Sequence, residues 1–253
     1  MSGTCRHGRR TRKAATASLM AAMILTGVAL SGGGLAANPE AGRFAPPAGC
    51  TAFLTVQSHG CKVSHHYTCQ GDAAGDQWRI DFGEQGPYFL SRIDRETQWV
   101  HSIGLIDGFV QDLAPGAPDP ASFSALTAEG HDTYDFSQIG SDGSLRRVRG
   151  FDALTGETAV IDGVTLERTA FEMHETDAAG VPLGSVQGHE WISRDWRLFF
   201  GGVTTEGAGA DARTIDRSPV RFDEPGDAGF LSTRPEHDCT LQVSALDAPG
   251  RSP

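Results

Sequence analysis

The stretch Gln77-Trp-Arg-Ile-Asp-Phe82 decides the fold class. In an extended strand, Trp78, Ile80 and Phe82 would lie on one side and the polar residues between them on the other, because successive side chains alternate. The same alternation returns over 99–105. Further strands are expected over 51–57, 88–94, 109–113, 132–138, 145–153 and 157–161. The pattern therefore predicts a mainly β protein.

Turn sequences separate these strands at intervals of about 8–14 residues, which is typical of hairpins. Parallel strands would need longer crossover connections, so we expect an antiparallel meander. The expected turns are Glu84-Gln-Gly-Pro87, Asp107-Gly108, Asp142-Gly143, Thr155-Gly156 and Asp177-Ala-Ala-Gly180. One short helix is expected to start at Pro120, capped by Asp119, and to continue through Ala121–Ala128.

The longest expected ribbon joins residues 164–177 to residues 181–200. Within its first strand the apolar positions change parity, from Leu166 to Phe171 and Met173. Such a change requires either a β-bulge or a change of the buried face. Long, bent antiparallel strands favour a curled sheet, either a barrel or a half-barrel.

Residues 1–37 have the pattern of a cleaved export signal. A basic start with five Lys or Arg residues precedes the apolar run Ala14–Leu30 and the small-residue stretch Ser31–Ala37. The alternative, a membrane anchor, is less favoured because a spanning helix needs about 20 apolar residues. We therefore expect a periplasmic or secreted protein with no membrane span in its mature chain.

The mature chain is predicted to be strongly acidic. The whole sequence has 21 Lys and Arg against 32 Asp and Glu, and the signal removes 5 basic and no acidic residues, which leaves 16 against 32 and a net charge of −16. Such a chain repels phosphate backbones, so nucleic acid is excluded as a partner. Within it we expect a flexible leader over 38–49, a single β domain over 50–239 and a flexible tail over 240–253.

Four cysteines remain after Cys5 leaves with the signal, an even number that allows three disulfide pairings. The favoured interpretation joins Cys61 to Cys69 and Cys50 to Cys239. The alternative joins Cys50 to Cys61 and Cys69 to Cys239. Disulfides are permissible because the export signal places the chain in an oxidising compartment.

Three histidines close to these cysteines raise the alternative of a metal site. His65 and His66 lie between Cys61 and Cys69, and His237 is two residues before Cys239. The Cys-x2-Cys spacing of structural zinc sites is missing, so disulfides are favoured and no metal or cofactor is expected.

No motif in the sequence identifies a reaction, and no catalytic residue is assigned. There is no Gly-x-Ser-x-Gly nucleophile motif, and His189-Glu190 lacks the second histidine of a zinc-protease motif. His174 and His189, together with Glu172, Glu175 and Glu190, could form a His/carboxylate site. More often, such residues form the solvent-exposed face of an antiparallel sheet.

Three stretches, Thr155–Arg168, Ile192–Leu198 and Pro225–Phe230, resemble a group of uncharacterised exported bacterial proteins. The resemblance covers most of residues 50–239 and implies no activity, cofactor or site residue. In architecture, a curled meander behind a signal also resembles the periplasmic half-barrels that carry lipids or lipoproteins.

The leading hypothesis is therefore a non-enzymatic binding module that holds an apolar small molecule or a protein partner in the concavity of the sheet. The residues expected to line that concavity are Trp78, Ile80, Trp99, Phe171, Trp191 and Phe200. The simpler alternative is that these side chains fill the core. A second hypothesis is a hydrolase or metal-binding protein that uses the histidines and carboxylates, and a third is a purely structural interaction module.

Overall fold

One antiparallel sheet runs through the protein in the computed structural model, which describes residues 42–207 and 212–239. Within these ranges the sheet has fourteen strands and is accompanied by one short helix. The elements are β1 (Cys50–Ser58), β2 (Lys62–Cys69), β3 (Gln77–Gly83), β4 (Gly86–Ile93), β5 (Trp99–Gly104), β6 (Val110–Leu113), α1 (Phe123–Glu129), β7 (His131–Gly140), β8 (Leu145–Ile161), β9 (Val164–Asp177), β10 (Pro182–Ser193), β11 (Leu198–Phe200), β12 (Val203–Glu206), β13 (Arg213–Asp216) and β14 (Pro219–Asp223).

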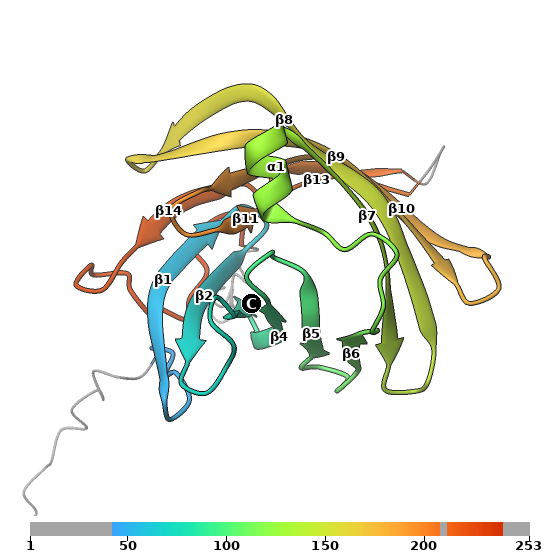
Figure 1. The fold of residues 1–253 in the computed structure, drawn as a ribbon. Coiled ribbons are helices and arrows are strands. Elements are labelled where there is room, and N and C mark those ends of the chain that lie inside the picture. Colours follow the sequence, from blue (N-terminus) through green and yellow to red (C-terminus); the bar gives the residue numbers. More distant parts are fainter. Residues whose placement is uncertain (1–41, 208–211, 240–253) are drawn as a thin grey trace, which may run out of the picture. The chain divides into compact units, whose positions relative to one another are not determined.

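The strand order confirms the antiparallel meander. From β1 to β10 each strand pairs with the next one along the chain, as Figure 1 shows. β12 then pairs with the edge of β10 that β9 leaves free, and β14 pairs with β1. The strand order in the described ranges is an open path that ends at β13 and β14, so hydrogen bonding does not close the sheet into a barrel.

Most strands coincide with the alternating stretches of the sequence, but β2 and the last three strands were not expected. β2 reads Lys62-Val-Ser-His-His-Tyr-Thr-Cys69, and its mostly polar residues hide the alternation. The turn expected at Thr155-Gly156 is wrong. β8 continues to Ile161 through an irregularity in its register between Leu154 and Thr158, where Gly156 adopts a φ of 79°. Four steps along β8, from Leu154 to Thr158, oppose two steps along β9, from Thr169 to Glu167, and the extra residues let one long strand bend.

The change of parity in β9 corresponds to a change of the buried face. Phe171 lies on the face of β9 that lines a cavity. Leu166 lies on the other face and belongs to the main apolar cluster. The members of that cluster are Leu54, Val56, Leu166, Leu198, Phe200 and Phe222. The core is therefore built where the beginning and the end of the chain meet.

The helix begins later than expected, because Ser122 and not Asp119 caps it. The Ser122 hydroxyl accepts a hydrogen bond from the Ala125 N–H at 3.1 Å. Glu96 fixes this end of the helix by accepting hydrogen bonds from the Ser124 N–H and from both serine hydroxyls. Gly130 ends the helix in the left-handed conformation that favours glycine.

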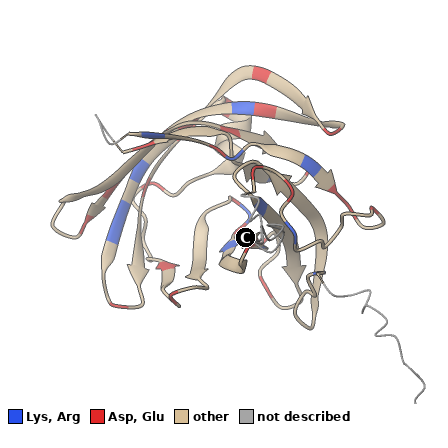
Figure 2. Ribbon diagram, turned by 180° about the vertical axis from the view of Figure 1, so that it is seen from behind, with Lys and Arg blue, Asp and Glu red and all other residues tan. Residues whose placement is uncertain are grey.

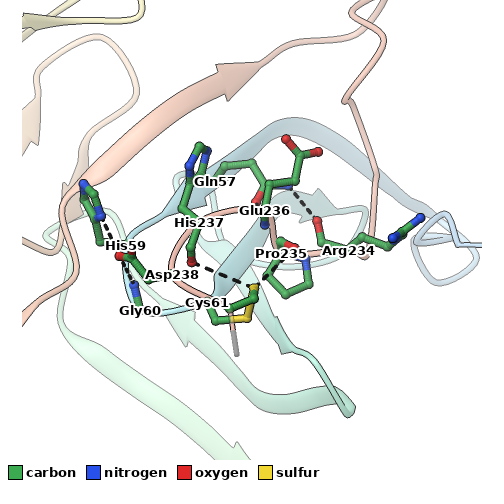
Figure 3. The surroundings of a disulfide bond; sticks show 10 residues. Gln57, His59, Gly60, Cys61, Arg234, Pro235, Glu236, His237 and Asp238 are labelled. Atoms are coloured by element: carbon green, nitrogen blue, oxygen red, sulfur yellow. Dashed lines mark hydrogen bonds and ion pairs between the residues drawn. A yellow bond between two sulfur atoms is a disulfide. The ribbon is translucent and has the colours of Figure 1, made fainter. Parts of the chain in front are cut away.

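The disulfides join Cys50 to Cys69 and Cys61 to Cys239, so both pairings considered from the sequence are wrong. β1 and β2 form a hairpin in which Cys50 is registered opposite Cys69, with Cα atoms 3.9 Å apart. Cys61 lies at the turn of this hairpin, about 25 Å along the strand from Cys69. The C-terminal segment crosses that turn, and Cys61 bonds to Cys239 there (Figure 3).

Both ends of the described chain are held against the sheet. The fully buried side chain of Gln57 donates a hydrogen bond to the Arg234 carbonyl and accepts one from the Glu236 N–H. At the other end, the ring of Phe44 stacks on His65 with a centroid distance of 5.0 Å. Part of the leader expected over 38–49 is therefore packed. The expected signal 1–37 and tail 240–253 lie outside the described residues.

Candidate functional site

A cavity of about 510 Å³ lies against one face of the sheet. The register of the strands explains its lining, because directly paired residues share a face. One row of paired residues that line it crosses β2 to β6 and consists of His66, Arg79, Ser91, Ser102 and Gln111. A second row of paired residues crosses β7 to β12 through Asp132, Asp152, Phe171, Gly188 and Thr204, and all of them except Gly188 line the cavity.

The apolar part of the wall is mainly aromatic. Trp78, Trp99 and Phe171, three of the six residues expected to line a concavity, are in contact with the cavity. The helix adds Phe123 and Leu126. The further aromatic residues of the wall are Phe89, Tyr134, Phe136 and Phe199.

The other three expected residues lie elsewhere. Ile80 is not part of the cavity wall and pairs with His65 and Leu90. Phe200 is part of the main apolar cluster, and Trp191 packs against that cluster. Phe200 and Trp191 therefore contribute to the core, as the simpler alternative proposed.

Two cations, Lys62 and Arg79, stand together on the β2–β3 side of the cavity. Lys62 is the only lysine after residue 37, and among the described residues its side chain has no hydrogen bond or ion pair. Its pKa is lowered by burial and by the charges of Arg79 and Arg217. The Nε of Arg79 lies 3.2 Å from Asp81 but is not aligned for a hydrogen bond.

Asp81 is the anion next to these cations. Burial by itself would raise its pKa, but Arg79, Lys62 and the Ser64 hydroxyl, which donates a hydrogen bond at 2.7 Å, together hold the pKa below its usual value. Asp81 is therefore ionised. It is already engaged by Ser64, and it faces two positive charges.

Carboxyl groups from β7, β8 and β10 also line the cavity. Asp132 and Asp152 face each other across β7 and β8. Burial, Glu190 and Asp132 raise the pKa of Asp152 to about 8. Burial also raises the pKa of Glu190 to about 7, although Arg79 and Lys62 oppose the change. A substantial fraction of these two carboxyl groups is therefore protonated at neutral pH, where each can donate a hydrogen bond.

Besides Nε of Arg79, three buried polar atoms of wall residues have no hydrogen-bond partner in the described structure. They are Oε1 of Gln77, Nδ1 of His66, a residue 3% exposed, and Oγ1 of Thr204, a residue 8% exposed. Burial, with help from Arg79, lowers the pKa of His66 to about 3, so its ring is neutral. Buried polar groups normally have partners, so these unpaired atoms are exceptions within the wall.

The histidines considered as metal ligands do not converge. His65 lies on the opposite face of β2 from His66, where its Nδ1 is 2.9 Å from the Thr55 hydroxyl. His237 lies in the C-terminal segment beside the Cys61–Cys239 disulfide (Figure 3). The sulfurs of Cys61 and Cys239 lie near a Glu84 carboxylate oxygen, but both are used in the disulfide.

The His/carboxylate group considered on β9 and β10 is also divided. His174 lies 2.8 Å from Glu172 on an exposed part of β9. His189 lies about 13 Å from His174 along the sheet, because it follows Ser185, the registered partner of His174, by four residues. Its Nδ1 is 3.3 Å from Arg168. Glu190 alone among the five residues lines the cavity.

Sequence reasoning missed the charged side of the cavity because it placed the apolar side of β3 inward. Phe82 does lie on a buried side, but there Phe44 and His65 cover it. Arg79 and Gln77, on the polar side, line the cavity instead. The alternation that predicted β3 contains both the apolar and the polar residues. It does not show which side is covered by other parts of the chain, such as Phe44, which is remote in sequence.

Comparisons with protein-family models, with curated proteins and with solved structures found no match to this chain. The resemblance to uncharacterised exported bacterial proteins therefore stays a prediction. Within the described ranges, no helix has the length and apolar character needed to cross a membrane. The two disulfides indicate an oxidising, extracytoplasmic location.

Proposed function

We propose that this protein is a non-enzymatic, periplasmic or secreted binding module that holds a small molecule in the cavity of its sheet. The observation that carries the proposal is the cavity itself. Its volume of about 510 Å³ lies within the range of about 300–1,000 Å³ that is typical of small-molecule sites. Its wall combines aromatic side chains with a few converging polar groups, which is the usual composition of such sites.

The proposal includes a half-barrel form of the sheet. Every strand from β2 to β12 contributes at least one residue to the wall of the same cavity. In addition, the Phe222 N–H of β14 donates a hydrogen bond at 2.9 Å to Asp162, in the turn between β8 and β9. The last strand therefore contacts the far hairpin, which supports a sheet that bends around its ligand.

A hydrolase is less well supported than a binding module. His66 is the histidine of the cavity wall, and its ring nitrogen Nδ1 has no carboxylate partner among the described residues. The serines of the wall therefore lack the oriented base that nucleophilic catalysis requires.

The test is binding of N-phenyl-1-naphthylamine, an uncharged aromatic probe, to the mature protein, together with native mass spectrometry of protein recovered from its export compartment. We expect saturable fluorescence enhancement and a co-purified adduct that is lost on denaturation. Ser102→Phe, which fills part of the cavity, should weaken probe binding. The matched variant Ser137→Phe, on the other face of β7, should not. A bare chain that binds no probe would overturn the proposal.

A further inference from the structure

We propose that the ligand is an amphipathic anion, whose aromatic or aliphatic body lies on the aromatic wall and whose acid group is held by Arg79 and Lys62. This inference rests on the proposed binding function and specifies the chemical class of the ligand. The acid group is a carboxylate, sulfonate or phosphate, because these accept several hydrogen bonds from a guanidinium and an ammonium group.

The first support is an excess of positive charge on the β2–β3 wall. The ionised carboxylate beside Lys62 and Arg79 there is Asp81, and Glu190, whose pKa is raised to about 7, also interacts with both cations. Other arginines of the cavity are paired: Arg146 binds Glu175 at 3.2 Å and Arg217 binds Glu206 at 2.9 Å. The amino group of Lys62 therefore lacks an anion in direct contact among the described residues, and an acidic ligand would provide one and favour the charged form of the lysine.

The second support is that the donors of Arg79 remain available. Its guanidinium lies over the ring of Phe89, 5.6 Å from the ring centroid, and its buried Nε makes no hydrogen bond in the described structure. A guanidinium over an aromatic ring keeps its N–H groups for an acceptor, and the Nη atoms of Arg79 make no hydrogen bond within the described residues. The registered neighbours of Arg79 are His66 and Ser91, both also in the wall.

The third support comes from two carboxyl groups of β8 and β10 that line the same cavity. The side chains of Asp152 and Glu190 have no hydrogen-bond partner among the described residues. Their raised pKa values keep a substantial part of both groups uncharged at neutral pH. In that state they do not repel an anion, and each offers a hydrogen-bond donor to it.

The composition of the chain makes this pair of cations unlike its surroundings. After residue 37 there are half as many basic as acidic residues, 16 against 32, and Figure 2 shows acidic positions spread over strands and turns. The sole lysine of this part of the chain nevertheless faces the cavity beside Arg79. A general basic character of the protein therefore does not explain the cluster.

The experiment compares two probes that share one skeleton. 1-Anilinonaphthalene-8-sulfonate carries a sulfonate, whereas N-phenyl-1-naphthylamine carries no charge. We expect the mature protein to bind the sulfonate more tightly. Lys62→Met and Arg79→Met should each weaken sulfonate binding by about tenfold or more, because a charge-assisted hydrogen bond is lost, and leave the neutral probe within about twofold. Lys62→Arg should restore binding, and Arg213→Met, on exposed β13, is the control for a removed surface charge.

A second measurement needs no variant, so it remains decisive if a substitution prevents folding. Saturating sulfonate should slow acetylation of Lys62 by acetic anhydride, measured by peptide mass spectrometry, whereas equal occupancy by the neutral probe should protect less. If both probes bind with equal affinity, respond equally to the variants and protect Lys62 equally, the proposal of an anionic ligand is refuted. The proposed binding function would remain intact. Failure of both probes to bind would overturn the binding function as well.

Discussion

Opening the Cys61–Cys239 disulfide should destabilise the protein more than opening Cys50–Cys69. The two bonds close loops of 178 and 19 residues. In the chain-entropy model, a loop of 178 residues contributes about 5 kcal/mol and a loop of 19 residues about 3 kcal/mol at 25 °C. The Cys61→Ser/Cys239→Ser variant is therefore expected to lose about 2 kcal/mol more than the Cys50→Ser/Cys69→Ser variant.

The C-terminal segment has contacts other than the Cys61–Cys239 disulfide, so its folded structure should survive the loss of that bond. Without the bond, Gln57 still holds the C-terminal segment through its two hydrogen bonds to Arg234 and Glu236, three residues that Figure 3 labels. Glu236 also still pairs with Arg221. The folded state should therefore change little, and the loss should come from the greater freedom of the unfolded chain.

Urea unfolding, followed by tryptophan fluorescence and far-UV circular dichroism, measures the free energy of unfolding of the unaltered mature protein and of the two double variants. Coincident transitions from both probes would show that each variant unfolds in a single step. An equal or larger loss in the Cys50/Cys69 variant would refute the reasoning from loop length. It would show that strain or residual structure in the unfolded chain determines the effect instead.

The remaining predictions concern single buried positions. Gln57→Leu should cost about 2–4 kcal/mol in urea unfolding, because it leaves two backbone groups within 234–236 unpaired; a loss below about 1 kcal/mol would contradict this. Gly150→Ala should cost about 1–3 kcal/mol or more in the same assay, because its Cβ would lie 2.2 Å from the Glu172 carbonyl oxygen, and an unchanged midpoint would show that the sheet can adjust. Glu190 has a pKa raised from 4.5 to about 7, so its contribution is present at low pH and is lost as pH rises to about 7; Glu190→Gln should therefore reduce the decline in stability between about pH 5 and about pH 8, and an identical decline would contradict the assignment.

The meander could be predicted from the sequence because its information is local. Alternation within one strand and a turn sequence before the next are sufficient to predict a hairpin, and most strands between β1 and β10 follow from them. β14 could not be found this way. Its partner β1 is about 160 residues distant, and Pro219-Val-Arg-Phe-Asp223 is short and partly charged.

The disulfides and the site depended on facts that are not local. Once β2 is overlooked, the hairpin that brings Cys50 opposite Cys69 is invisible, and the pairing cannot be deduced. Likewise, Arg79 could be recognised as a cavity residue only by knowing that Phe44 covers the other side of β3. A strand with one apolar and one polar side does not itself say which side faces a binding site.

The pairing of β14 with β1 has a consequence for how the protein is made. Among the described strands β1 is synthesised first and β14 last, so one edge of β1 has free N–H and C=O groups until β14 has been made. Such an edge can capture a strand of another chain, which is a route to aggregation. Cys61 also stays a free thiol until Cys239, its disulfide partner, has been synthesised. The nascent protein therefore needs protection at this edge, and a chain truncated before residue 219 would expose it permanently.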